Sequence, residues 1–391
     1  RVLLSSRFHV KYVVVSNDSK GGYNFSEGTS LSETLIVAER VDKHRNDEET
    51  VFINLLRKPS TALEAIMLAE EVMNQARTLT TGEARLVSIR DSEALVLKID
   101  RSQLLENVDN WNRFIALPDP ELLKVVTSLL RNGELTFGDY HVKIPLTRFN
   151  DLIEKLGIDR HQFHDHFQIA ATQTPYPIIH GGGEEVRRRI MVKPNSYAFP
   201  RTNRATQIFR EHASRMLVPD RIRWDTAHAT ALYSKEPVLS NIFYAVRLKS
   251  REDVKDIVEK VLVLWLNTTW GILTILFSRQ ETEGTWAEIK MAQWRLLPVL
   301  DVSKLNQELL KRLAEVFDRY ADKQLRRISE QFNPDNPDPV RLGIDIDFLS
   351  AIDPTLDSSR VKDSLLELYK HVHYALRQWI GDSHSMKAHE E

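Results

Sequence analysis

The sequence predicts an α/β fold of the mixed α+β kind, with more than one domain. Two β-branched runs near the N-terminus, in residues 8–16 and 31–41, predict buried strands. Apolar residues at helical spacing predict long helices at 60–77, 306–330 and 361–380. The chain has 391 residues, more than one hydrophobic core usually holds, so we expect at least two domains.

Composition excludes several classes of site. A hydrophobic content of 42% and a charged content of 28% are those of a folded globular chain. The lack of cysteine excludes disulfides, thiolate catalysis and cysteine-ligated metals, and it fits the cytoplasm, where we expect the protein. The chain opens on Arg1 without the regions of a signal peptide, and we expect it to be part of a larger protein.

The two N-terminal strands are joined by a loop, residues 17–29, that is rich in Gly, Ser, Asn and Asp. Two strands need a sheet to belong to. Since no other strand of comparable strength lies close by, we expect the rest of this sheet upstream of Arg1.

A helix follows at 60–77, with Ser60 or Thr61 as its cap and Glu64 near its third position. A strand pair is predicted at 86–89 and 94–99. Further along the chain we expect a helix at 121–131, after a Leu-Pro-Asp-Pro start, and another at 149–156, ending at a glycine.

The C-terminal half begins with a loop-rich, basic region at 159–225, which contains a glycine triplet at 181–183. A helix is predicted within it at 204–216. Beyond this helix, short strands are expected at 216–221, 229–233 and 243–248, and helices at 251–276, 288–294, 306–330 and 361–380.

The most apolar stretch, residues 258–277, is interrupted by Glu259, Lys260 and a polar run at 267–269. We therefore predict a buried helix there and no membrane partner. Asn267 needs a hydrogen-bonded partner if it is buried, so we interpret it as structural. The tryptophans of this region are expected in the core or scaffold, namely Trp265, Trp270, Trp286 and Trp294.

Basic residues are concentrated in one part of the chain. The formal net charge is −2, which gives no overall attraction to nucleic acid. Residues 184–223, however, hold ten Lys or Arg against four carboxylates, an excess of six. Three successive arginines, Arg187, Arg188 and Arg189, follow the glycine triplet and could reach phosphates or a guanine edge. A solvated charge run is the alternative interpretation.

A second group of side chains in the same region suits base edges and stacking, because it combines amides, aromatics and guanidinium groups in a loop bounded by prolines. Ordinary turn chemistry beside proline is the alternative. The predicted DNA contacts are therefore the arginine cluster and six further residues, Lys193, Asn195, Tyr197, Arg201, Asn203 and Arg204.

We expect no metal site and no hydrolytic site. His161, His164 and His166 are spaced so that they do not share one helical face, and the chain offers no cysteine to join them. Asp225 and His228 could belong to a hydrolytic triad, but the sequence has no Gly-x-Ser-x-Gly elbow.

Two blocks resemble one protein family. In residues 25–38 a loop with a phenylalanine leads into Leu35-Ile36-Val37-Ala38, which resembles the last hairpin of the sheet in gamma-class adenine-N6 DNA methyltransferases. Residues 264–299 run from Leu-Trp-Leu-Asn through Gly271 to Leu-Pro-Val, which resembles the end of that family's target-recognition region. The order of the blocks, methylase first and target recognition second, is that of the family.

The resemblance implies a domain order and an activity. Residues 1–60 would be the last strands of a Rossmann-like methylase sheet, 61–145 a helical connector, 146–330 a mixed α/β target-recognition domain and 331–391 a C-terminal helical extension. The intact enzyme would belong to a restriction-modification system and transfer a methyl group from S-adenosylmethionine to adenine N6 in double-stranded DNA. Phe25 would stack on the flipped adenine, although Phe25 packing its own loop is equally compatible and Tyr23 is a competitor.

The sequence departs from the family at the catalytic motifs. The family's cofactor loop and its Asn/Asp-Pro-Pro-Tyr/Phe tetrapeptide have no counterpart, since no Pro-Pro pair occurs in the chain. The triplet at 181–183 lacks GxGxxG spacing and a convincing strand before it. We therefore expect no catalytic residue and no bound cofactor in this chain, and an upstream methylase half of the same protein as its partner.

Two alternatives stay open at this point. The chain could be a non-catalytic DNA-specificity subunit that works beside a separate methylase. It could also be part of a fused restriction endonuclease and methylase, although no Asp…Glu-x-Lys nuclease signature occurs in the sequence.

Overall fold

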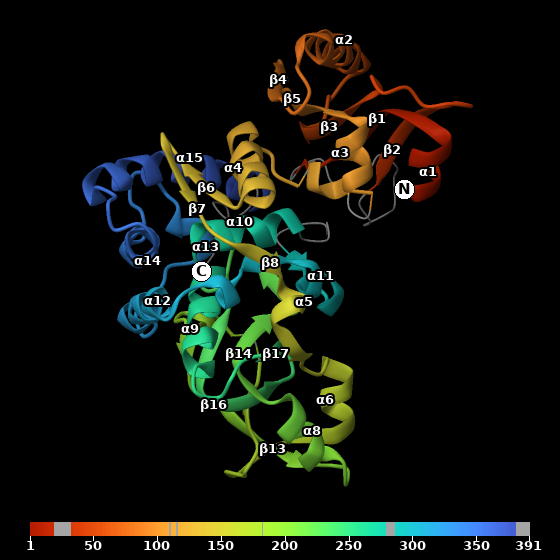
Figure 1. Ribbon diagram of the computed structural model, residues 1–391. Coiled ribbons are helices and arrows are strands. Elements are labelled where there is room, and N and C mark those ends of the chain that lie inside the picture. The colour runs from red at the N-terminus through yellow and green to blue at the C-terminus, as the bar shows by residue number, and fades with distance from the viewer. Residues whose placement is uncertain (19–32, 109–110, 115, 182, 279–285, 381–391) are drawn as a thin grey trace, which may run out of the picture. The chain divides into compact units, whose positions relative to one another are not determined.

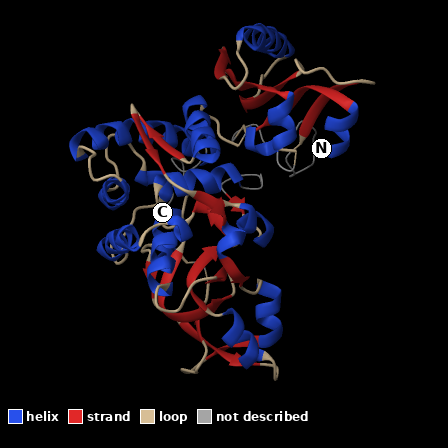
Figure 2. Ribbon diagram, in the orientation of Figure 1, coloured by secondary structure: helices blue, strands red, loops and turns tan. Residues whose placement is uncertain are grey.

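The computed structural model describes residues 1–18, 33–108, 111–114, 116–181, 183–278 and 286–380. The chain divides into two compact units. Unit 1 contains residues 1–124 and 371–391 with Trp286, and unit 2 contains most of 125–370. Helices and strands are interspersed in both units (Figure 2), which confirms the predicted mixed α+β class. The four-part domain division rests on motifs rather than on compactness, and it stays a prediction.

Unit 1 is built on a sheet with the strand order β2-β1-β3-β5-β4. β1 pairs antiparallel with β2 and parallel with β3, and β5 lies antiparallel between β3 and β4. The strands are β1 (Phe8–Ser16), β2 (Thr34–Arg40), β3 (Glu49–Arg57), β4 (Ala84–Ile89) and β5 (Ser92–Asp100). The helical elements are α1 (Val2–Arg7), α2 (Ala62–Thr78), α3 (Arg101–Glu106) and the 3₁₀ turn η1 (Trp111–Phe114).

The sheet of unit 1 buries side chains on both faces. Leu68, Val72 and Ala76 of α2 pack on one face. Leu104 and Trp111 pack on the other face, which is lined by alternate valines of β1. The predicted helix cap is confirmed, since Thr61 Oγ1 accepts a hydrogen bond from the backbone N–H of Glu64 at 3.2 Å.

One premise of the sequence analysis is wrong for this sheet. The expectation of further strands upstream of Arg1 rested on finding no other strand nearby, yet β3 lies between the predicted helix and the N-terminal strands and pairs with β1. Residues 49–57 carry buried side chains on nearly every position rather than alternating ones. A strand buried on both faces lacks the period-2 signal that the prediction relied on.

Unit 2 contains a larger sheet with the strand order β10-β13-β11-β16-β14-β17-β9, in which β12 also pairs with β16. Its strands are β9 (Ile153–Leu156), β10 (Phe167–Ala170), β11 (Pro177–Ile179), β12 (Met191–Val192), β13 (Ser196–Pro200), β14 (Ser214–Pro219), β16 (Leu232–Ser240) and β17 (Phe243–Leu248). Short pairs are formed by β6 (Glu134–Phe137) with β7 (Tyr140–Lys143), β8 (Leu146–Arg148) with β19 (Pro298–Leu300), and β15 (Arg221–Arg223) with β18 (Trp286–Glu288).

The helices of unit 2 are α5 (Phe149–Leu152), α6 (Arg160–His166), α7 (Glu184–Arg187), α8 (Ala205–His212), α9 (Lys255–Leu266), α10 (Thr269–Ser278), α11 (Met291–Leu296), α12 (Gln307–Tyr320), α13 (Ile328–Gln331) and α14 (Pro339–Ile352), with the 3₁₀ turn η2 (Val302–Lys304). Among them, α6, α8 and α9 contact strands of the larger sheet, and α12 packs on α9 and on α14 (Figure 1). Two further helices, α4 (Pro120–Asn132) and α15 (Ser358–Ile380), have residues in both units.

The predicted continuous helix at 251–276 is wrong, because the chain breaks it into α9 and α10, which meet at 71°. Asn267 ends α9, and its side chain is fully buried. Its Oδ1 accepts from the backbone N–H of Thr230 at 2.9 Å, and its Nδ2 donates to Ala231 O at 2.8 Å and Val263 O at 2.9 Å. The prediction that Asn267 is structural is confirmed.

The start of α10 is capped from another helix. Asp345 of α14 is buried, and its Oδ1 accepts from the backbone N–H of Thr269 at 2.9 Å. The hydroxyl of Tyr369 donates to Asp345 Oδ2 at 2.6 Å. An anionic acceptor at a helix N-terminus satisfies donors that the helix cannot pair itself. Hydrogen bonds from Thr230 and Ala231, just before β16, and from Asp345 of α14 therefore hold the break between α9 and α10.

Gly271 allows α9 and α10 to approach closely. A Cβ atom there would lie 2.1 Å from the carbonyl oxygen of Trp265, inside any permitted contact. Trp265, Trp270 and Trp294 are fully buried, as predicted for core residues. The closing Leu-Pro-Val segment forms β19 and pairs antiparallel with β8. The described residues of the motif block, 264–278 and 286–299, are therefore scaffold.

Three other predicted elements differ from the structure. The predicted helix at 306–330 ends at Tyr320, and the separate short helix α13 begins at Ile328. The predicted helix at 149–156 ends after one turn, and residues 153–156 form β9, which pairs with β17. The predicted helix at 204–216 ends at His212, where β14 begins two residues later. In the last two cases tertiary pairing with β17 overrides helical propensity. Within the described residues, no single helix has the length and apolarity to cross a membrane, and only the bent pair α9–α10 has them jointly.

Candidate nucleic-acid interface

The basic segment after the glycine triplet is fixed by backbone hydrogen bonds on two sides. On one side, the N–H of Tyr233 in β16 donates to Ile190 O at 2.9 Å. On the other side, Met191 N–H donates to Ala321 O at 2.8 Å, and Leu325 N–H donates to Arg188 O at 2.8 Å. Since the main chain is bonded on both sides, the side chains of this segment project from a fixed support rather than from a free loop.

These pairings bring basic residues from distant parts of the chain to one hollow of about 580 Å³. We call it the cationic hollow. Lys235 comes from β16, and Asp322 and Gln324 come from the segment after α12. The charged and polar side chains that line the hollow are Arg188, Arg189, Lys193, Asn195, Lys235, Asp322 and Gln324.

The cationic hollow holds four cations and one carboxylate. Arg189, Lys193 and Lys235 are exposed, and none of them makes an ion pair with another described residue. Like charges held this close repel one another unless an anion neutralises them. Guanidinium and ammonium groups in such an arrangement are the usual ligands of phosphate oxygens.

Sequence reasoning missed Lys235. It lies more than forty residues beyond Lys193 and is flanked by Ser234 and Glu236, so no local charge run marks it. The parallel pairing of β12 with β16 brings it beside the basic segment, with Val192 opposite Ser234 in register.

Arg187 does not belong to this surface, although it is adjacent to Arg188 in the sequence. It is 9% exposed, its guanidinium lies 5.0 Å from the ring centroid of Phe243, and Nη1 donates to Arg221 O at 3.3 Å. Burial lowers the pKa of the Arg187 guanidinium, and the nearby Asp220 works in the opposite direction. A buried guanidinium with these contacts cannot reach a phosphate from its place, so we exclude Arg187 from the interface proposed below.

The second predicted group lies around β13 and the start of α8. Asn195 is exposed, but its side chain pairs with the backbone of His180, accepting at 2.8 Å and donating at 2.9 Å. Tyr197 lies in β13, opposite Pro177 and Ala170. Arg201 donates to His164 O at 2.8 Å and is exposed. Asn195 and Arg201 therefore also hold the local fold.

Asn203 and Arg204 are exposed at the start of α8. Figure 1 shows α6, α8 and β13 at the opposite end of unit 2 from α10. Phe199 of β13, which the sequence analysis did not select, is 54% exposed there. The structure thus separates the predicted contacts into the cationic hollow and a mixed polar and aromatic end of unit 2.

The expectation that no convincing strand precedes the glycine triplet is wrong. A strand does precede it, since β11 ends at Ile179 and pairs parallel with β16. Gly181 has a φ of +74°, and its N–H donates to Asn241 Oδ1 at 3.1 Å. The helix that follows, α7, has four residues, which is too short for the aligned N–H groups of a phosphate loop.

Two of the histidines considered for other chemistry, His166 and His228, and the acid Asp225 have structural partners. His166 is the last residue of α6, and its Nδ1 lies 2.9 Å from Thr202 Oγ1. His228 Nδ1 lies 2.6 Å from Leu325 O, and Asp225 is paired with Arg223 at 2.9 Å. Among the described residues, no group of three His, Asp or Glu side chains has the arrangement to hold a metal ion. Phe25 and Tyr23 lie outside the described residues.

Comparisons with known proteins add one finding. No protein-family model and no curated protein matches this sequence. Among solved structures, the chain is similar to the type IIG restriction endonuclease BpuSI. The match has 10% sequence identity and a TM-score of 0.43, and it covers 97% of this chain and 45% of that one. The chain thus spans less than half the length of the structure it matches.

Proposed function

We propose that this chain recognises double-stranded DNA, and that the cationic hollow binds phosphates of the duplex. The observation that carries this proposal is the set of four cations that two separate segments, the basic segment and β16, bring around one hollow. Such a set would release condensed counterions on binding, which drives protein–DNA association and makes it salt-dependent. Because the net charge of the chain is −2, the excess of positive charge at this surface is local and does not extend over the whole chain.

We further propose that the chain is the target-recognition part of an S-adenosylmethionine-dependent adenine-N6 DNA methyltransferase of a restriction-modification system. The two motif blocks in their family order support this assignment. Methyl transfer would be carried out by another part of the same protein, because this sequence lacks the tetrapeptide that holds the adenine amino group. Base contacts would come from the end of unit 2 that carries Arg201, Asn203 and Arg204.

A salt titration tests the phosphate contacts. The variant in which Arg189→Ala, Lys193→Ala and Lys235→Ala are combined removes three cations of the hollow. We expect its duplex affinity at low salt to fall at least about tenfold. We also expect the slope of log K against log salt concentration to become shallower by about 3, since each lost phosphate contact contributes roughly 0.9.

The matched control changes the same number of exposed cations elsewhere in unit 2. Lys311 on α12, and Arg360 and Lys362 on α15, are exposed and outside the hollow. Their combined replacement by Ala makes the same change in net charge. Equal losses in both triple variants would show attraction by overall charge alone and would contradict the site.

The methyltransferase assignment has its own test. The full-length protein, expressed from the complete reading frame, is incubated with duplex DNA and methyl-labelled S-adenosylmethionine, and modified bases are identified after digestion. We expect label in N6-methyladenine. A full-length protein that binds the duplex but transfers no methyl group would leave the DNA-specificity function and remove the methyltransferase assignment.

A further inference from the structure

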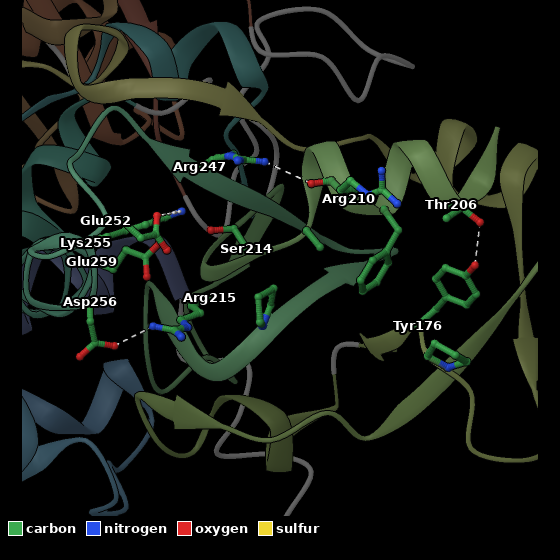
Figure 3. A pocket seen from close by; sticks show the side chains of 14 residues that line it. Tyr176, Thr206, Arg210, Ser214, Arg215, Arg247, Glu252, Lys255, Asp256 and Glu259 are labelled. Atoms are coloured by element: carbon green, nitrogen blue, oxygen red, sulfur yellow. Dashed lines mark hydrogen bonds and ion pairs between the residues drawn. The ribbon is translucent and has the colours of Figure 1, made fainter.

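A second cavity of unit 2, of about 610 Å³, shares no lining residue with the cationic hollow. Its walls come from α8, β14 and α9, with further residues from the segment before β11, from β16 and from β17. We call it the Glu259 pocket (Figure 3). Its volume lies within the range of cavities that hold small molecules.

Glu259 is an unsatisfied carboxyl group in this pocket. The residue is 1% exposed, and its Oε2 has no hydrogen-bond partner among the described residues. Burial, which is not compensated by a partner, raises the pKa of Glu259 to about 7. A buried acceptor without a donor costs free energy, so such a group marks a place where a ligand's donors fit.

The neighbouring cations are committed to other acids, which explains why Glu259 is left without a partner. Asp256, one turn earlier on α9, accepts from Arg215 Nη1 at 2.9 Å and from Tyr233 Oη at 2.5 Å. Lys260 also lies 3.2 Å from Asp256. Lys255 pairs with Glu252 at 3.6 Å, at the mouth of the pocket.

The pocket also has an uncommitted cation. Arg210 on α8 is exposed, and its guanidinium makes no ion pair with another described residue, whereas Arg247 is paired with Glu154 at 3.1 Å. Figure 3 shows Glu259 and Arg210 on different sides of the pocket. Apolar surface lies between the helices, from Phe209, Tyr176 and the prolines at 175 and 237.

Glu259 and Arg210 together determine which chemical groups the two ends of a ligand must carry. One end must offer hydrogen-bond donors to a buried carboxylate, and the other must be anionic, with a flat or apolar body between them. A simple amine or guanidinium ligand would suit Glu259 but would leave Arg210, the pocket's uncommitted cation, without an anionic partner. A simple phosphate would suit Arg210 but would be repelled by Glu259.

A guanine nucleotide meets both requirements without carrying a positive charge. Guanine presents two adjacent N–H donors, at N1 and at the 2-amino group, which a carboxylate accepts as a bidentate pair. Adenine and cytosine each present one donor beside one acceptor, which suits a protonated acid instead. We propose that the Glu259 pocket binds a guanine nucleotide, with Glu259 on the N1 and 2-amino edge and Arg210 on the phosphate.

The charge state of Glu259 makes this specificity depend on pH. The groups around it are Lys255, Asp256 and Glu252 from α9 and the segment before it, Arg215 from β14 and Tyr233 from β16. As the pH rises from 6 to 8, Glu259 loses its proton, so the carboxylate form that guanine requires increases. The phosphate group titrates alike in GMP and AMP, and the ratio of their affinities therefore reports the base alone.

Calorimetric titration of the whole chain with GMP and AMP, without DNA, tests the pocket. We expect GMP to bind at least tenfold more tightly than AMP at pH 8, with a smaller ratio at pH 6. In Glu259→Gln the GMP preference and its pH dependence should both be lost. In Arg210→Ala the affinity for GMP should fall about fivefold or more, while guanosine binding stays unchanged. Gln207→Ala, on α8 outside the pocket lining, is the control and should change neither.

A second arm distinguishes a free nucleotide from a nucleotide of DNA. Duplexes with one bulged deoxyguanosine or one bulged deoxyadenosine are compared in the wild type and in Glu259→Gln. A Glu259-dependent preference for the bulged guanosine assigns the pocket to an extrahelical base, whereas GMP binding without this preference assigns it to a free nucleotide. If neither GMP nor the bulged guanosine is preferred, or if the preference survives Glu259→Gln, the proposal is overturned. Because the GMP arm contains no DNA, its failure is separate from a failure of the cationic hollow.

Discussion

The helical layer α9–α10 and the cationic hollow, both in unit 2, differ in how their polar groups are buried and paired. In the helical layer polar groups are few, buried and bonded to several partners, as Asn267 and Asp345 are. In the cationic hollow, Arg189, Lys193 and Lys235 are exposed and make no ion pair with another described residue. The first arrangement fixes a single structure, because every unsatisfied group there is costly. The second keeps charge available for a ligand at little cost in water.

Glu259 combines features of both regions. It belongs to α9, and its Oε2 has no hydrogen-bond partner among the described residues, just as Arg189, Lys193 and Lys235 make no ion pair with another described residue. Arg187 shows the converse. It belongs to the basic run by sequence, and it is buried on Phe243 as a core residue is. The difference between the regions is therefore set by burial and partners rather than by residue type. Four substitutions test this difference.

The largest effect is expected at Asn267. The variant Asn267→Leu leaves the buried N–H of Thr230 and the carbonyl of Ala231 without their partners. We expect the free energy of unfolding to fall by about 4 kcal/mol, since each buried unpaired group costs roughly 1–3 kcal/mol. Urea unfolding followed by circular dichroism measures it. Thr274→Val is the control, because its hydroxyl bonds only the carbonyl of Trp270 within α10, and about 1 kcal/mol or less is expected. Equal losses would contradict the account of Asn267.

The next largest effect is a pH-dependent gain at Glu259. The pKa of Glu259 in the folded chain is about 7, against 4.5 for the ordinary group, so the folded state holds more protons than the unfolded state between these values. The contribution of Glu259 to the stability of the wild type therefore falls as the pH rises from about 5 to 8.

Glu259→Gln removes this titration. We expect the variant to be more stable than the wild type by up to about 3 kcal/mol at pH 8, at roughly 1.4 kcal/mol per pKa unit, and equal to it near pH 5. Urea unfolding at both pH values measures the difference. A constant difference at both would show that packing, not the charge of Glu259, is responsible.

Arg187→Ala is expected to cost about 2 kcal/mol of unfolding free energy, from the lost stacking on Phe243 and the lost packing of the aliphatic stem. DNA affinity at temperatures below unfolding should keep its salt slope, because Arg187 reaches no phosphate. Thermal unfolding and a salt titration of the same preparation measure the two quantities. A reduced slope with unchanged stability would place Arg187 in the DNA interface after all.

Arg189→Ala is expected to have the smallest effect on stability, within about 0.5 kcal/mol, because its side chain is exposed and makes no ion pair with another described residue. The slope of log K against log salt should become shallower by about 1. Arg187→Ala and Arg189→Ala can thus be compared by unfolding stability and by the salt slope of DNA affinity, although the two arginines are only two positions apart. Loss of stability in Arg189→Ala would remove the distinction.

Much of the secondary structure follows from local patterns. The strand at 8–16, the helix capped by Thr61 and the strand pair of β4 and β5 form as predicted, because each carries its own period and turn signals. β3 was missed because a strand buried on both faces has no alternation. The break at Asn267 was missed because its partners lie in other elements, at Thr230 and Ala231.

The candidate sites were less accessible from the sequence. The excess of basic residues in 184–223 located the hollow's main segment, but it could not separate Arg187, which packs on Phe243, from its neighbours. Lys235 carried no local signal, because strand pairing alone brings it to Lys193. Glu259 was noted in the sequence only as an interruption of an apolar run, and its lack of a partner depends on Asp256 having taken the nearby cations.

The sequence by itself determined the mixed α+β class, the buried position of the tryptophans at 265, 270 and 294, and the region where positive charge gathers. These properties depend on composition and on spacing along the chain, which short-range periodicity reports. Only the tertiary structure decided which charged groups are buried or paired, because deciding contacts such as Arg187 with Phe243 and Arg215 with Asp256 join residues far apart in sequence. It buried Arg187, left the hollow's lysines exposed, and left Glu259 in a pocket with no donor of its own.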